Sequence, residues 1–215
     1  MKITALKQQI KNPDRVSIYL DGKYSFSLTL NQVVAEKIKT GLELDDDRLS
    51  LLKQKSTDEK LRLKAMNWTL QRPHSVRELR DYLKRVVYSQ SRKSQSRRVE
   101  GTDNAIIEIV EEFVKRGWVD DEVFAKWWVE RSSRASRSKS HLRSELMQKG
   151  VDREIIGEVL SEREDDGLLS ELVAKLKLKA KYQDEQKLMR YLVGKGFSYS
   201  SVREALKLGA DESPD

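Results

Sequence analysis

The stretch Ser138-Lys-Ser-His-Leu-Arg-Ser-Glu-Leu-Met-Gln-Lys-Gly150 carries the pattern that decides the fold. A helix-capping residue opens it, leucines follow at the fourth and eighth positions after the cap, and glycine closes it. Residues four apart share one face of a helix, and the opening serine satisfies free amide groups of the first turn. The closing glycine permits the left-handed exit of a helix end. The stretch therefore predicts one short helix with a single buried face.

The same pattern occurs three times along the chain, with a capping residue, two leucines, and then valine or glycine. The three copies are Ser75, Leu79, Leu83 and Val87; Ser138, Leu142, Leu146 and Gly150; and Asp184, Leu188, Leu192 and Gly196. In the first copy, Ser75 and Glu78 also form a capping-box pattern.

Each copy is flanked by two further apolar stretches of helical period. The preceding helix is marked by Ala65 and Trp68, by Phe124 and Trp128, or by Leu172 and Leu176, and the following one by Ile106-Ile107, Ile155-Ile156, or Val202 with Leu206. One three-helix unit buries little apolar surface, so such units stack. We predict a mainly α-helical protein with three tandem three-helix repeats that form an elongated, curved solenoid.

The amino-terminal segment follows a strand pattern instead. Val16, Ile18 and Leu20 alternate with polar residues before Asp21-Gly22, a pair typical of a tight hairpin turn. A β-hairpin is predicted there, with residues 2–6 as a candidate third strand. Small helices are expected to follow, the first capped by Asn31.

The spacing within the first repeat indicates an insertion. Val87 and Ile106 are nineteen positions apart, whereas Gly150 and Ile155 are five apart, and the difference is 14 residues. The segment at about 89–104 is polar and basic, which predicts a flexible loop. The predicted divisions are residues 1–56 for the hairpin and short helices, 57–118, 119–164 and 165–208 for the repeats, and 209–215 for a disordered tail.

Composition narrows the function classes. The chain has 42 Lys and Arg against 35 Asp and Glu, a formal charge of +7, no cysteine and only two histidines. The basic excess favours polyanionic partners, while the missing thiols exclude disulfides and thiolate metal sites. We expect no catalytic residues, no cofactor and no metal. No apolar stretch is long enough to span a membrane, and no secretion leader is present, so a cytoplasmic monomer is expected.

Clustered cations are the candidate contact residues for a partner or for nucleic acid. The central run has five cations and no acid, at the end of one helix and the start of the next; two further groups lie in the insertion and in the third repeat. The candidates are Arg131, Arg134, Arg137, Lys139 and Arg143; Arg92, Lys93, Arg97 and Arg98; and Lys187, Arg190 and Lys195. Such cations suit phosphates or an acidic surface.

Two neighbouring features have alternative interpretations. Asp120 and Asp121 suggest a metal site, but too few oxygen ligands converge there, so Asp120 is interpreted as a helix cap. Trp128 lies four residues after Phe124 and is predicted to be core. Trp127 points elsewhere on the helix, toward an inter-repeat contact, solvent or a stacked base.

Several segments together resemble the RecX family. The segment Trp118-Val-Asp-Asp-Glu-Val-Phe-Ala125 and the helix Lys126-Trp-Trp-Val-Glu-Arg-Ser-Ser133 are similar to its signature. Further similarity lies in Ser75-Val-Arg-Glu-Leu79, in Leu146-Met-Gln-Lys-Gly-Val151 and in the lead-in of residues 12–26. The resemblance covers residues 1–208 and departs from the family at the insertion after Val87.

The resemblance implies a modulator of the RecA recombinase in recombination, DNA repair and the SOS response. Such a protein binds the RecA filament on single-stranded DNA and limits its growth, ATP turnover, strand exchange and co-protease activity. Weak, salt-dependent, sequence-tolerant binding to single-stranded DNA is expected from the cation clusters.

Two other functions are alternatives. The outline of helix, glycine turn and helix over residues 142–160 is compatible with a stand-alone DNA-binding protein with tandem helix-turn-helix-like units. A nuclease is the other alternative, for which the chain offers no dense constellation of catalytic side chains.

Overall fold

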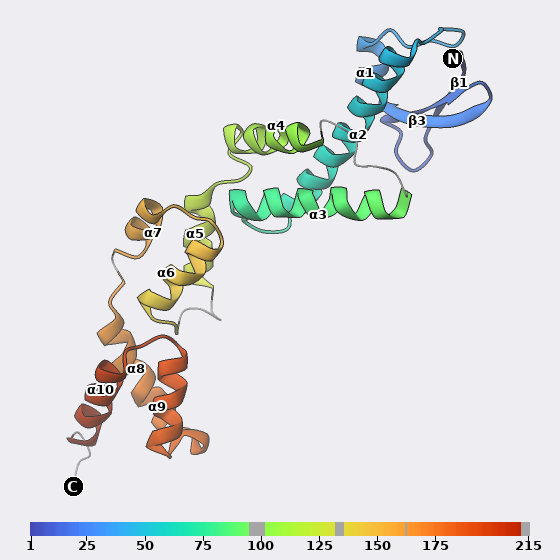
Figure 1. The fold of residues 1–215 in the computed structure, drawn as a ribbon. Coiled ribbons are helices and arrows are strands. Elements are labelled where there is room, and N and C mark those ends of the chain that lie inside the picture. Colours follow the sequence, from blue (N-terminus) through green and yellow to red (C-terminus); the bar gives the residue numbers. More distant parts are fainter. Residues whose placement is uncertain (95–101, 132–135, 162, 212–215) are drawn as a thin grey trace. The chain divides into compact units, whose positions relative to one another are not determined.

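The computed structural model describes residues 1–94, 102–131, 136–161 and 163–211 (Figure 1). These residues form two compact units. The first comprises Met1–Leu70 and Tyr82–Ile109, and the second Gln71–Asp81 and Val110–Asp215. The structure is mainly helical with a small amino-terminal sheet, as predicted.

The sheet of the first unit is antiparallel, with the order β1 (Ile3–Gln8), β2 (Arg15–Leu20) and β3 (Lys23–Thr29). Asp21 and Gly22 both have positive φ angles, 46° and 83°, which is the type I′ conformation of a tight hairpin. The hairpin and the third strand are thus confirmed. The apolar face of the sheet packs on the helices that follow, and the cluster consists of Ile3, Ile18, Leu20, Phe26, Leu28, Ile38, Leu44, Leu49 and Leu52.

Helix α1 (Leu30–Ala35) begins earlier than the sequence predicted. Its cap is Thr29, not Asn31, because the Thr29 hydroxyl accepts from the Gln32 amide while the Gln32 side chain accepts from the Thr29 amide. This reciprocal pair satisfies two free donors at once. Helix α2 (Asp46–Thr69) follows, capped by Asp45.

Helices α3 (Val76–Ser94) and α4 (Thr102–Lys115) border the predicted insertion. The prediction of a loop over 89–104 is wrong at both ends, since residues 89–94 and 102–104 are helical. Gln, Arg and Lys are good helix formers, so the polar stretch prolongs α3 without an apolar face. Residues 95–101 lie outside the described part.

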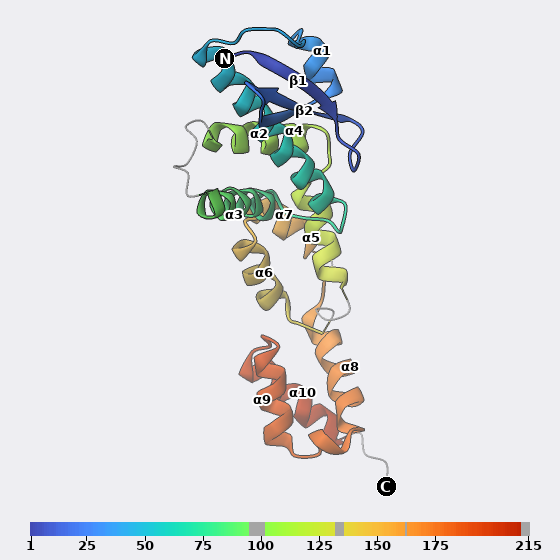
Figure 2. The same ribbon diagram turned by 90° about the vertical axis from the view of Figure 1, so that its right-hand side faces the viewer.

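The second unit holds the second and third three-helix repeats (Figures 1 and 2). The second consists of α5 (Asp121–Glu130), α6 (Lys139–Gln148) and α7 (Arg153–Val159). The third consists of α8 (Asp165–Lys177), the 3-10 turn η1 (Ala180–Tyr182), α9 (Glu185–Gly194) and α10 (Tyr199–Asp211). Because α10 reaches Asp211, residues 209–211 are helical rather than part of a disordered tail, and 212–215 are outside the described part.

Each of these two repeats has its own core. All the pattern leucines are buried, at 0% exposure, which confirms the face that the spacing predicts. Asp120 caps α5 by accepting from two amides, and Trp128 is buried, so both predictions are confirmed. The core of the second repeat consists of Phe124, Ala125, Trp128, Leu142, Leu146, Val151, Ile156 and Leu160, and that of the third of Leu169, Val173, Leu176, Leu188, Leu192, Phe197, Val202 and Leu206.

Within the second unit, the capping serines also link consecutive repeats. Ser75 Oγ accepts from the Glu78 amide and donates to the carbonyl oxygen of Lys149, at 2.7 Å. Ser138 Oγ likewise accepts from the His141 amide and donates to the carbonyl oxygen of Gly196, at 2.6 Å. We call these two contacts the first joint and the second joint. Each cap therefore ties its own helix to the end of the equivalent helix in the next repeat.

Two more features recur at both joints. The amide of Val76 donates to Asp121, and the amide of Lys139 donates to Asp165. Glycine is required at each helix end: a Cβ on Gly150 would lie 2.7 Å from Arg77 Cβ, and one on Gly196 would lie 2.6 Å from His141 Cβ. The repeats thus pack by one geometry used twice, while the overall curvature stays a prediction.

Candidate functional site: a cationic surface around Trp127

Two cations of the central run are used in packing. The Arg137 guanidinium pairs with Glu145 and donates to His141 Nε2 at 2.9 Å. The Lys139 ammonium reaches the carbonyl oxygens of Ser161 and Arg163, at 3.4 and 3.3 Å. The Arg137 side chain therefore stabilises α6, and the Lys139 side chain ties the start of α6 to the segment between α7 and α8.

The other described cations of the run face solvent. Arg131 follows α5, and its guanidinium lies 5.4 Å from the centre of the Trp127 ring. Arg143 lines a recess of about 320 Å³ together with Met147, Arg153 and Ile156. Arg134 lies outside the described residues. Arg131 and Arg143 thus differ from Arg137 and Lys139, whose charged groups already have partners within the protein.

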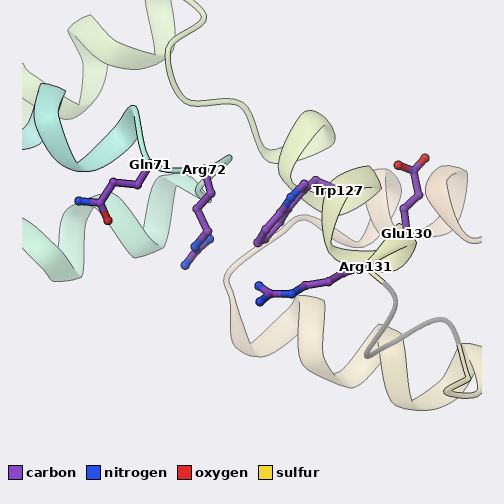
Figure 3. Close-up of a pocket in the computed structure, with 5 residues that line it drawn as sticks. All are labelled: Gln71, Arg72, Trp127, Glu130 and Arg131. Carbon is purple, nitrogen blue, oxygen red and sulfur yellow. The ribbon is translucent and has the colours of Figure 1, made fainter.

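A second recess surrounds Trp127 (Figure 3). It measures about 550 Å³ and is lined by Gln71, Arg72, Trp127, Glu130 and Arg131. The Arg72 guanidinium lies 5.1 Å from the Trp127 ring centre. In Figure 3 both guanidinium groups lie beside the indole, whereas the Glu130 carboxylate points away from them. The recess therefore combines an aromatic ring with two positive charges.

Glu78 orients Arg72. Its carboxylate accepts from Arg72 at 2.9 Å and from the Lys149 ammonium at 2.7 Å, and His74 Nδ1 lies 3.2 Å away. Burial alone would raise the pKa of Glu78, but the hydrogen bonds and charges of Arg72 and Lys149 outweigh it and lower the pKa from 4.5 to about 2. Glu78 is thus ionised at neutral pH and fixes two cations beside the aromatic residues of α5.

The remaining predicted cations are dispersed. Lys187 and Arg190 lie on α9, and Lys195 is its C-cap, with its ammonium 5.4 Å from the Tyr191 ring centre. Arg92 and Lys93 belong to α3, where their side chains are not described, and Arg97 and Arg98 lie outside the described residues. The structure does not bring these groups together with the central run.

Sequence reasoning missed Arg72 and Arg153. Arg72 precedes α3 in the first repeat, whereas Trp127 lies on α5 in the second, and no periodicity connects them. Arg153 is the first residue of α7, where a cation carries no distinct pattern. In both cases only the packing of helices shows which side chains meet.

Other kinds of site have little support in the described part of the chain. There, no cluster of three or more His, Asp or Glu side chains has the arrangement of a metal site. Within the same residues, no helix combines the length and the apolar character that a bilayer crossing needs.

Comparison with known proteins identifies the family. Residues 1–45 match the regulatory protein RecX N-terminal domain, residues 120–160 the RecX second three-helix domain, and residues 168–206 the RecX third three-helix domain. The chain belongs to the RecX family. The resemblance noted in the sequence is therefore confirmed.

Relatives match this RecX-family chain over nearly its whole length. A regulatory protein RecX from Bacillus pumilus is 31% identical, covering 97% of this chain and 78% of the relative. One from Listeria welshimeri is 29% identical, covering 100% and 78%. These relatives are named as regulatory proteins rather than as enzymes.

Solved structures share the fold. A crystal structure titled regulatory protein RecX superposes with a TM-score of 0.65 at 21% identity, covering 94% of this chain and 98% of that one. RecX from Lactobacillus salivarius has a TM-score of 0.51 at 18% identity, covering 70% and 94%. At these identities the likeness supports the fold alone.

Proposed function

We propose that this chain is a non-enzymatic regulator that binds the RecA filament on single-stranded DNA and restrains it. The restraint acts on filament growth, ATP turnover, strand exchange and co-protease activity, in recombination, DNA repair and the SOS response. The observation that carries the proposal is the match to RecX domains at both ends of the chain and in its middle. The protein works in the cytoplasm as a monomer and needs no cofactor.

The cationic side chains of the second repeat support a contact with an acidic protein surface. Arg143 and Arg153 flank Met147 and Ile156 in one recess, so positive charge surrounds an apolar floor. Charged rims steer partners and select them, while a buried apolar centre adds affinity. We assign the contact with RecA to this recess and the contact with DNA phosphates to other cations.

RecA-dependent ATP turnover on single-stranded DNA tests the proposal. Added protein should suppress turnover in proportion to its concentration. Replacing Arg143 and Arg153 with Ala should weaken this suppression about tenfold or more, because two charge-assisted contacts are lost. Lys126→Ala is the matched control, since Lys126 is an exposed cation of the same repeat that is already paired with Glu122.

Three results would count against this assignment. Undiminished turnover with the wild-type protein present would overturn the regulatory function. Full suppression by a folded double variant would move the RecA contact away from the recess. A footprint on one preferred duplex sequence, without any effect on RecA, would support a stand-alone DNA-binding protein.

A further inference from the structure

We propose that Arg72, Trp127 and Arg131 form a binding site for an unpaired nucleotide of single-stranded DNA. The indole stacks on the base, and the two guanidinium groups hold the adjoining phosphates. The inference deepens the proposed function and rests on it, since it locates the DNA contact of a protein that acts on DNA-bound filaments. The lining residues and the recess are shown in Figure 3.

The ring of Trp127 is held in place before any ligand arrives. It is half-buried, packs against the core of the second repeat, and contacts the rings of Phe124 and Trp128 at centroid distances of 6.0 and 6.2 Å. An indole fixed by its neighbours loses little conformational freedom when a base stacks on it. Trp127 also lines the recess of about 550 Å³, a volume large enough to admit a nucleobase beside the two arginine side chains.

The two guanidinium groups give the recess its selectivity for anions. They lie 5.1 and 5.4 Å from the Trp127 ring centre, within the range of cation–π attraction. Arg131 has no ion-pair partner in the described part of the chain. Arg72 is held by Glu78, but that carboxylate also pairs with Lys149, so its one negative charge is divided between two cations. The two guanidinium groups thus outweigh the single Glu130 carboxylate of the lining, and the recess keeps a positive charge.

This combination suits a nucleotide better than an acidic peptide. A carboxylate would engage the guanidinium groups and leave the aromatic ring unused, whereas a nucleotide presents a phosphate and a planar base together. Stacking tolerates any base, because every base has a π-face. The base must be unpaired, since a duplex hides that face between neighbouring base pairs. The site should consequently bind single strands without sequence preference.

A second arginine–tryptophan pair in the same unit shows what the site requires. Arg116 lies 4.7 Å from the ring centre of Trp118, which is 40% exposed. That guanidinium is paired with Glu112 at 3.0 Å, and no second cation is within cation–π range of the ring in the described residues. This pair resembles the Trp127 site in composition but lacks its unneutralised charge. It therefore provides a matched control.

The test measures binding of a fluorescent oligothymidylate to the full chain at low salt, without RecA. Trp127→Leu should weaken binding about tenfold or more, and Trp127→Phe should restore most of the affinity because phenylalanine still stacks. Arg131→Ala should weaken binding and lower the slope of log affinity against log salt by about one. Arg116→Ala should stay within about twofold of the wild type. Oligothymidylate should also quench tryptophan emission, and Trp127→Phe should remove that quenching.

Equal affinity of the wild type and a folded Trp127→Leu variant would overturn the proposal, as would equal loss in the Leu and Phe variants. Polyglutamate that competes with the oligonucleotide at equal charge would also overturn it and assign the recess to an acidic protein segment. Because RecA is absent, this result is independent of ATP turnover. The ATP-turnover experiment can therefore refute the regulatory function without refuting the nucleotide site, and the binding experiment can refute the nucleotide site without refuting the regulatory function.

Discussion

The second and third repeats place different residues at the same capping position, Ser138 and Asp184. Both accept hydrogen bonds from the first-turn amides of their helix. Ser138 is 1% exposed and also donates to the Gly196 carbonyl in the next repeat, whereas the Asp184 side chain is 48% exposed. A hydroxyl can accept and donate together, but a carboxylate can only accept. The hydroxyl proton thus allows Ser138 to bond to its own helix and to the next repeat at once, which the Asp184 carboxylate cannot do.

The two joints differ in the residue three positions after the serine. Glu78 occupies it in the first joint and attracts Lys149 of the next repeat, at 2.7 Å. His141 occupies it in the second, where burial and the charges of Arg137 and Lys195 lower the pKa of the imidazole. One backbone geometry thus carries an attractive ion pair in one joint and a neutral imidazole near cations in the other.

The largest effect is expected from Ser138→Asp. The carboxylate still caps α6, but it cannot donate to Gly196 and places a buried negative charge beside a carbonyl oxygen. Unpaired buried charges cost about 3–5 kcal/mol, whereas Ser138→Ala should cost about 1–3 kcal/mol for the lost hydrogen bonds. Urea unfolding and hydrogen exchange of α9 and α10 measure the loss. The reverse exchange, Asp184→Ser, is the control and should stay within about 0.5 kcal/mol, because both residues cap well. A loss from Ser138→Asp no larger than that from the Asp184→Ser control would show that donation to Gly196 contributes nothing.

The next largest effect is expected at Gly196, whose carbonyl oxygen accepts the hydrogen bond from the Ser138 hydroxyl. Gly196 has a φ of +90°, and an added Cβ would overlap both His141 Cβ and Ser138 Oγ at 2.6 Å. Gly196→Ala should therefore cost about 2–4 kcal/mol, the sum of backbone strain and overpacking. Gly117→Ala is the control, since its φ is +67° with nothing within 4 Å, and it should cost only the strain, about 1–2 kcal/mol. Equal destabilisation by the two substitutions would mean that the joint yields to the added methyl group.

The repeat pattern was predictable from the sequence because leucines four apart can bury only one helix face. Asp21-Gly22 and Asp120 were predictable for a similar reason, since turn and cap chemistry is local. The hydrogen bond from Ser138 to Gly196 was not predictable. A sequence indicates that a serine caps a helix, but it does not indicate which distant carbonyl oxygen accepts the hydrogen bond of the serine hydroxyl. From the sequence alone, Arg137 and Lys139 are interpreted as unpaired cations. The partners of Lys139, the carbonyl oxygens of Ser161 and Arg163, lie in a later segment that only packing brings near, whereas Arg137 pairs with Glu145 and His141 of the helix that directly follows it. The contact of Arg72 with Trp127 was not predictable either, because the two residues are far apart in the sequence and only packing brings them together.

Acid should distinguish the two joints by the pH at which each weakens. The pKa of Glu78 is lowered from 4.5 to about 2, so its contribution is complete above pH 4.5 and is lost as the pH falls toward 2. Burial, Arg137 and Lys195 lower the pKa of His141 below 6.5. Glu145 lies 3.5 Å from its Nε2 but is paired with Arg137. The neutral imidazole is thus favoured in the fold, and its contribution is complete above pH 6.5 and lost as the pH falls through the lowered pKa.

Two substitutions test these windows. Glu78→Gln should remove the decline in stability between pH 4.5 and 2, worth about 1–2 kcal/mol after solvent screening, and leave the decline below pH 6.5 intact. His141→Gln should do the opposite, with a smaller effect because the imidazole is partly exposed. Hydrogen exchange of α6 and α9, followed from pH 7 downward, measures both: α9 should lose protection first. Simultaneous loss in both helices, unchanged by either substitution, would show that the joints respond to total charge rather than to these two side chains. Separate losses, each removed by its own substitution, would mean that the residue three positions after each capping serine sets the pH at which that joint weakens.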